Sequence, residues 1–152
     1  MKKLHFLFAL CLMLVSTLSF AQTKPIVKFK PPKLFTQIGT FRDSVQVSVA
    51  DAEDLVGKPL KVFDGAKAVY TISSYIFIYK RVGVTEDEQT GKVTPTSNLI
   101  ANTFKITPLP QGWIDQVKEQ VKAGDELHFV DVIAKNAKGQ VMYAPNLKLV
   151  VR

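Results

Sequence analysis

Few residues of this chain have the types and the spacing that chemistry requires. His128 is the one histidine outside the first apolar stretch, and neither a second histidine nor a cysteine lies near it in the sequence. Zinc sites and catalytic triads need such partners. The serines lie in no nucleophile-elbow context, and no G-x-G-x-x-G or P-loop pattern is present. We therefore predict a surface or rim histidine and no enzymatic activity.

The acidic segment 51–57 (DAEDLVG) is the best candidate for a metal site. Its carboxylates, Asp51, Glu53 and Asp54, carry the oxygen ligands that hard cations prefer. The segment lacks a spaced ligand partner and a glycine at the offset of a calcium-binding loop. We predict a solvated loop or a one-turn helix here, and neither a metal nor a cofactor in the protein.

Aromatic and basic side chains are the remaining candidates for a binding surface. Tyrosines within an extended segment can form an aromatic stripe that contacts a ligand, or they can pack in the core and across strands. Lysines near the N-terminus can dock on a partner, or they can line the solvated face of an extended strand. The candidate partner-binding residues are Lys28, Lys30, Tyr75, Tyr79 and Tyr143.

The first 21 residues have the three-part layout of a secretory signal peptide. Lys2 and Lys3 form the positive region, residues 4–15 are apolar apart from one histidine, and small residues precede the boundary at Ala21. A transmembrane anchor is the alternative, but the apolar run is shorter than the roughly 20 residues that span a bilayer. We expect cleavage near Ala21, a periplasmic or secreted protein, and no integral membrane span afterwards.

The cysteine count and the net charge limit the chemistry and the classes of partner that the protein could have. The 152-residue chain contains one cysteine, Cys11, which lies in the predicted signal peptide, so the processed protein would have no disulfide and no thiol chemistry. The formal net charge is +7. Without Lys2 and Lys3 the processed protein would carry +5, a modest basic excess. In an exported protein this argues against nucleic acid as a partner; an anionic surface or an acidic face of another protein is a more natural target, and a merely solvated lysine surface is the alternative.

The segment 111–123 carries the helical pattern of the chain. Trp113, Val117 and Val121 recur at intervals of four residues, which places them on one face of a short amphipathic helix. Gly124 follows directly and is expected to end the helix in a left-handed conformation. We predict that Trp113 packs the helix on a sheet.

Strand patterns account for most of the remaining sequence. Residues 42–50 alternate valine with polar residues, and residues 69–84 are rich in β-branched and aromatic residues. We predict an all-β fold, an immunoglobulin-like β-sandwich of about 7–8 strands with one short helix at about 111–123. A Lys/Pro-rich extended arm, 22–36, would precede the single domain, 37–152. Further strands are predicted at 60–63, 99–107, 127–134, 141–143 and 147–151.

The pattern of turns and strands in this last third resembles a known family. The helix end with its Gly124-Asp125 turn, the alternating strand 127–134, the turn 137–139 and the final strand after Pro145 are similar to the end of the C-terminal domain of the gliding-motility protein GldM. The segment 69–81 is similar to an upstream strand of that domain, so the resemblance covers roughly residues 60–151. Lys138 departs from the pattern, because the family usually has an aspartate in this turn.

The resemblance implies a location and a role. GldM is a long inner-membrane protein of the type IX secretion and gliding apparatus of Bacteroidetes, and its last periplasmic domain is immunoglobulin-like. A separate domain of this kind would be a periplasmic, non-catalytic module that binds an envelope or secretion-apparatus protein. We expect an unpaired strand edge to carry the binding, either the N-terminal lysine-rich strand or the last strand, 147–151. The alternative is a carbohydrate- or small-ligand-binding sandwich in which Trp113, Tyr75, Tyr79 and Tyr143 stack on the ligand.

Overall fold

The structure is a computed structural model that describes residues 29–152. The predicted signal peptide and the first part of the predicted basic arm, residues 22–28 with Lys28, lie outside the described residues. The remaining part of the chain is built mainly of strands, which confirms the predicted all-β, sandwich-like class. Within residues 29–152 the elements are β1 (Leu34–Ile38), β2 (Phe41–Arg42), β3 (Ser44–Val47), α2 (Val49–Val56), β4 (Leu60–Asp64), β5 (Val69–Glu86), β6 (Val93–Phe104), α3 (Gln111–Gln120), β7 (Glu126–Lys135), β8 (Val141–Tyr143) and β9 (Leu147–Val151).

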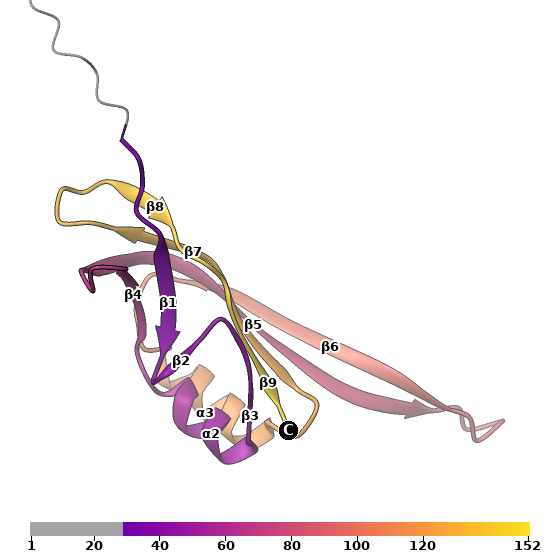
Figure 1. Ribbon diagram of the computed structural model, residues 1–152. Coiled ribbons are helices and arrows are strands. Elements are labelled where there is room, and N and C mark those ends of the chain that lie inside the picture. Colours follow the sequence, from indigo (N-terminus) through magenta and orange to yellow (C-terminus); the bar gives the residue numbers. More distant parts are fainter. Residues whose placement is uncertain (1–28) are drawn as a thin grey trace, which may run out of the picture. The chain divides into compact units, whose positions relative to one another are not determined.

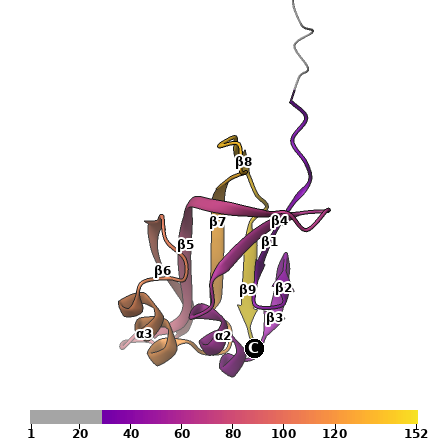
Figure 2. The same cartoon turned by 90° about the vertical axis from the view of Figure 1, so that its left-hand side faces the viewer.

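Two groups of strands share the long strand β5 (Figures 1 and 2). The small sheet has the order β2-β1-β4, and the large sheet has the order β6-β5-β7-β9-β3, with β8 paired to one end of β7. β5 joins them because Val69 and Tyr70 pair with β4, whereas the segment from Thr71 to Lys80 pairs with β7. All pairs are antiparallel except β3 with β9. Figure 2 shows the two helices side by side near one end of the sheets.

The core lies between the inner faces of the two sheets and the helices. Alternation along β1 buries Leu34 and Ile38, and alternation along β4 buries Leu60 and Val62. The large sheet and the helices contribute the other fully buried side chains. These include Phe77, Phe129, Leu127, Leu147, Leu149, Val56 and Val117.

The prediction of a single helix was wrong, because α2 occupies part of the acidic segment that was expected to be a loop or a single helical turn. Ser48 accepts a hydrogen bond from the backbone N–H of Asp51, and the Asp51 side chain accepts one from the Ser48 backbone. This capping box satisfies donors that a helix start otherwise leaves free. Ala52, Leu55 and Val56 then bury the inner face of the helix. Packing stabilises eight residues that would not stay helical alone.

The end of α3 also differs in detail from the prediction. The helix ends at Gln120, and its C-cap is Val121 in an extended conformation. Gly124 does have the predicted positive φ of +94°, but it belongs to the turn that leads into β7. Trp113 makes edge-to-face contacts with Phe77 and Phe104, which confirms that it packs the helix on the sheet.

Simple alternation fails in β5 and β7 because both strands are irregular. The β5–β7 register shifts twice between Ile72 and Ile76, so Tyr70 and Tyr75 are both buried although they are five positions apart. In β7, Asp131 has a φ of +49°, and beyond it Val132 and Ala134 are buried on the same side as Phe129. Alternation had placed Val132 and Ala134 on the opposite face from Phe129.

Candidate functional site

The free edge of β6 is the candidate binding feature in the described part of the chain. β6 pairs with β5 over its whole length, from Phe104 opposite Tyr75 to Val93 opposite Glu86, and no other strand among residues 29–152 pairs with it. Ten of its 12 residues are exposed. The hydrogen-bonding groups along its outer side are therefore available to an additional strand.

The far half of the β5–β6 pair is a two-stranded ribbon. Pairing between β5 and β7 ends where Lys80 lies opposite Glu126, but pairing between β5 and β6 continues to Glu86. Figure 1 shows this ribbon extending away from the other strands. Its side chains include Val84 and Val93, which are 69% and 55% exposed. Two-stranded ribbons are marginally stable in water, so such a ribbon gains stability from a third strand.

The sequence of β6 lacks most of the usual protection of an edge strand. Its residues, VTPTSNLIANTF, include no lysine, arginine, aspartate or glutamate. Charges, bulges and prolines normally prevent edge-to-edge pairing, and β6 has only Pro95. Leu99, near its middle, is 57% exposed. The strand thus presents an uncharged, partly apolar edge.

The edges predicted from sequence are different. The last strand, β9, lies between β7 and β3 and is paired on both sides, so the prediction that it offers a free edge was wrong. The parallel β3–β9 pair covers it, and parallel pairing of distant segments has no local sequence signal. The N-terminal lysine-rich strand falls largely outside the described residues.

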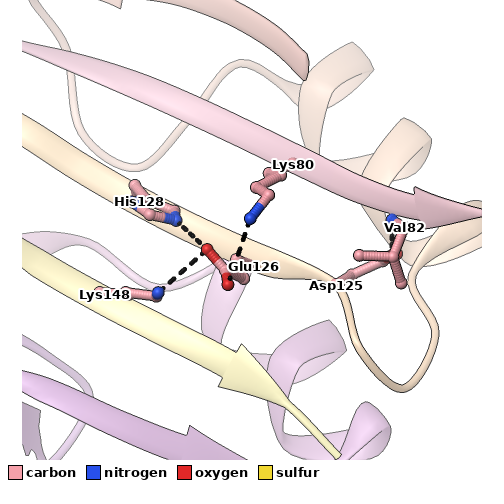
Figure 3. A network of polar contacts seen from close by, with 6 residues as sticks. All are labelled: Lys80, Val82, Asp125, Glu126, His128 and Lys148. Atoms are coloured by element: carbon pink, nitrogen blue, oxygen red, sulfur yellow. Dashed lines mark hydrogen bonds and ion pairs between the residues drawn. The ribbon is translucent and has the colours of Figure 1, made fainter. Parts of the chain in front are cut away.

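A polar cluster lies on the face of the large sheet that points away from the core (Figure 3). Glu126 is at its centre: one carboxylate oxygen lies 2.7 Å from His128 Nε2 and 3.0 Å from Lys148 Nζ, and the other lies 3.5 Å from Lys80 Nζ. The four residues come from β5, β7 and β9. Register places them together, since His128 lies opposite Lys148 and Lys80 lies opposite Glu126.

The charged and polar neighbours of Glu126 favour the ionised form of its carboxyl group. The hydrogen bond from Lys148 lowers the pKa of Glu126 to about 2, with His128 and the charge of Lys80 acting in the same direction against the opposing effect of burial. A carboxylate that stays ionised and hydrogen-bonded is a poor general acid or base near neutral pH. The arrangement ties three strands together, and His128 is a half-buried rim residue, as predicted.

Asp125, which precedes Glu126, is a buried carboxyl group with a complete set of partners. Its oxygens accept hydrogen bonds from the Tyr79 hydroxyl at 2.8 Å, the Val82 backbone N–H at 2.9 Å and the Lys122 backbone N–H at 3.2 Å. The contact with Val82 is visible in Figure 3. Asp125 thereby fixes β5 at the position where the β5–β6 ribbon leaves the large sheet.

Two of the predicted binding tyrosines belong to the core. Tyr75 and Tyr79 are 1% and 0% exposed, so their assignment as partner-binding residues was wrong and core packing explains them. The Tyr75 hydroxyl donates to the Ile106 carbonyl, and burial raises the pKa of Tyr75 to about 12. Burial, followed by the hydrogen bond to Asp125, also raises the pKa of Tyr79.

The other predicted binding residues are at the surface or outside the described part. Tyr143, on β8, is 76% exposed, and Lys30 is exposed just before the first strand. Lys28 lies outside the described residues. The structure therefore does not bring the four described residues, Lys30, Tyr75, Tyr79 and Tyr143, together in one surface site.

No cluster of three or more potential metal ligands occurs between residues 29 and 152. In the same part of the chain, no helix is long and apolar enough to cross a membrane.

Sequence reasoning did not identify the β6 edge or the Glu126 cluster. The strand was expected at 99–107, although pairing with β5 begins at Val93. A usable signal was present, since Val93 to Ser97 continue a run without charges. The Glu126 cluster had no such signal, because its members are separated by up to 68 positions and only the strand register unites them.

The sequence was compared with known proteins: no family model matches it, and no curated protein matches it either.

Proposed function

We propose that this chain is a non-catalytic protein-interaction module that adds a strand of its partner to the free edge of β6. The observation that carries the proposal is a 12-residue edge strand without a charged residue, exposed along nearly its whole length. In strand addition, backbone hydrogen bonds supply affinity and alternate side chains supply specificity. β6 offers both, with Leu99 and Ala101 on one face and Ile100 on the other.

The base of the ribbon supports this role because it is firmly held. Tyr75, Phe77 and Tyr79 anchor β5 in the core, and Asp125 binds the backbone of Val82 just beyond them. A binding strand that is fixed before association loses less conformational entropy when the partner arrives. The fold therefore favours presentation of β6 as a template for pairing.

The location and the partner class are part of the proposal. The signal peptide predicted at residues 1–21 and the resemblance to the C-terminal domain of GldM both support a periplasmic or secreted protein whose partner belongs to the envelope or to a secretion apparatus. The absence of cysteine after residue 21 is compatible with either location.

The test compares cross-linked partners of edge variants in the bacterium that produces the protein. The double variant Leu99→Lys/Ala101→Lys places two charges on the β6 edge, which discourages strand addition. Val141→Lys is the control for an added lysine on another strand, since Val141 is also exposed, at 56%, but lies on β8; the single variant Leu99→Lys matches it in charge. Quantitative mass spectrometry should find one envelope protein enriched with wild type and with the control, and reduced at least about tenfold with the double variant. Equal recovery with the double variant would refute edge binding.

The carbohydrate-binding alternative has less support. Of the four aromatic residues suggested for stacking, Tyr75 and Tyr79 are buried and Trp113 packs against Phe77 and Phe104. Of the four, Tyr143 is left as a residue that could stack on a sugar, and a single exposed tyrosine does not form a carbohydrate-binding surface. A glycan that raises the melting temperature of wild type, but not of Tyr143→Ala, would revive this alternative.

A further inference from the structure

The outward face of the small sheet combines partly exposed aromatic rings with positive charge. On β1 and β4, Phe35 lies opposite Phe63, and their rings stack with centroids 5.8 Å apart. Gln37 lies opposite Lys61 on one side and opposite Arg42 on the other. Since alternate residues share a face, all five side chains lie on the side opposite the buried residues of β1 and β4.

Arg42 is held in place on this face with most of its donors free. Its guanidinium carbon lies 4.5 Å from the centroid of Phe63 and 5.8 Å from that of Phe35. Its Nε donates to the Gln37 side-chain oxygen at 3.0 Å. The four N–H groups on the two terminal nitrogens of the Arg42 guanidinium have no partner among the described residues. A planar fork fixed in this way is suited to bind a carboxylate.

Three lysines surround the same rings. Lys61 and Lys67 line a shallow hollow of about 240 Å³ together with Arg42, Phe63 and Val69, and the Lys33 ammonium lies 5.5 Å from the Phe35 centroid. None of these four cations forms an ion pair within residues 29–152.

The carboxylate at the end of β4 already has hydrogen-bond donors. Asp64, at the end of β4, accepts hydrogen bonds from the Ala66 and Ala68 backbone N–H groups and from the Tyr70 hydroxyl. These bonds shape the β4–β5 turn, and the hydrogen bond from Ala68 contributes most to the lowered pKa of Asp64. Asp64 stays ionised but forms no ion pair with these four cations, so its single charge offsets only part of theirs and an incoming anion would meet a net positive surface.

We propose that this cation–aromatic face is a second binding site, for an acidic segment of a partner protein that carries an apolar side chain beside its carboxylate. Arg42 would bind the carboxylate through its free N–H groups. The apolar side chain would lie against Phe63 and Val69, and Val69 is 79% exposed. The lysines add attraction over a longer range. The site is independent of β6, so failure of either proposal leaves the other standing.

Charge alone does not account for the arrangement, which makes a peptide a better fit than a uniformly charged polymer. Cations alone would attract any polyanion, but here the Arg42 guanidinium lies over the stacked rings of Phe35 and Phe63 and is hydrogen-bonded to Gln37. Aromatic rings next to the charged groups contribute affinity only if the ligand brings apolar area of its own.

The direct test is fluorescence anisotropy with a labelled peptide of alternating glutamate and leucine. Residues 29–152 contain the site, and the processed full chain is the protein used. Wild type should bind this peptide, should ignore its lysine–leucine counterpart, and should lose affinity in about 0.5 M NaCl. Arg42→Gln should weaken binding about tenfold, because charge-assisted bonds are lost while the contact with Gln37 can persist. Lys118→Gln, an equal charge change on the exposed side of α3, should change affinity less than twofold.

Two outcomes would overturn the proposal. The first is equal affinity of the Arg42→Gln and Lys118→Gln variants for the glutamate–leucine peptide, with both variants melting as wild type does. The second is binding of poly-glutamate or dextran sulfate as tight as binding of the peptide, which would indicate unspecific attraction of polyanions. Phe63→Leu, which keeps apolar volume but removes the ring, should weaken peptide binding and leave poly-glutamate binding unchanged.

Discussion

Removal of the Asp125 carboxyl group should destabilise this protein more than any other exchange of an acidic residue among those the structure describes. Asp125 is 0% exposed and accepts hydrogen bonds from Tyr79, Val82 and Lys122. Alanine at this position would leave three donors without their acceptor. Other carboxylates, such as Asp87 in the β5–β6 turn, bind similar backbone donors at the surface, where water can replace them.

The expected cost follows from the burial of each donor. The Tyr79 hydroxyl is fully buried, and an unsatisfied buried donor costs about 1–3 kcal/mol. The two backbone N–H groups are partly buried, so each should cost about 1 kcal/mol. Asp125→Ala should therefore reduce the free energy of unfolding by about 4 kcal/mol, a large part of the 5–15 kcal/mol typical of a domain. Asp87→Ala, the control, should cost about 0.5 kcal/mol.

Urea denaturation followed by tryptophan fluorescence is a suitable assay, because Trp113 packs against β5 and β6. Should Asp125→Ala fail to fold, Asp125→Asn keeps the shape and one acceptor and should cost about 2 kcal/mol. Tyr79→Phe removes one donor and should cost about 1 kcal/mol. In a double-mutant cycle, Asp125→Asn and Tyr79→Phe should show a coupling free energy of about 1 kcal/mol.

The reasoning would be refuted by a coupling near zero, or by similar losses for Asp125→Asn and Asp87→Asn. Either result would mean that water reaches the Asp125 site, so that the buried hydrogen bonds do not determine its contribution.

Three other exchanges test separate parts of the fold. Gly124→Val should cost at least about 2 kcal/mol, because φ is +94° and a Cβ would lie 2.7 Å from Val82 Cγ2; an unchanged melting temperature would contradict this. The pKa of Glu126, about 2, lies below its ordinary 4.5, so its ionised form stabilises the fold above pH 4.5, and about 1–2 kcal/mol should be lost as pH falls toward 2. In Glu126→Gln, urea midpoints should lack this acid-dependent loss; the same loss in the variant would exclude Glu126 as its source. Trp113→Ala should cost about 3–4 kcal/mol in urea denaturation followed by circular dichroism, and a loss below 1 kcal/mol would show that α3 is held elsewhere.

Local patterns in the sequence were sufficient for most strands and for α3. β-branched and aromatic residues indicated β5, and alternating apolar residues indicated β7, although register shifts in β5 and the positive φ of Asp131 in β7 interrupt the alternation. The helical spacing of Trp113 and Val117 indicated α3, because one side of the helix packs on the sheet. α2 was missed although Ser48 and Asp51 have the spacing of a capping box, a signal that acidic composition obscured.

The sequence by itself thus determined the all-β class, most of the elements and the scarcity of chemically active side chains. The tertiary structure alone decided which strands meet. It paired β9 with β3, left β6 with a free edge, buried Tyr75 and Tyr79, and gathered Arg42 with Phe35 and Phe63. The physical reason is that strand pairing and bulges depend on contacts between distant segments, whereas periodicity reports only whether each segment has a buried side.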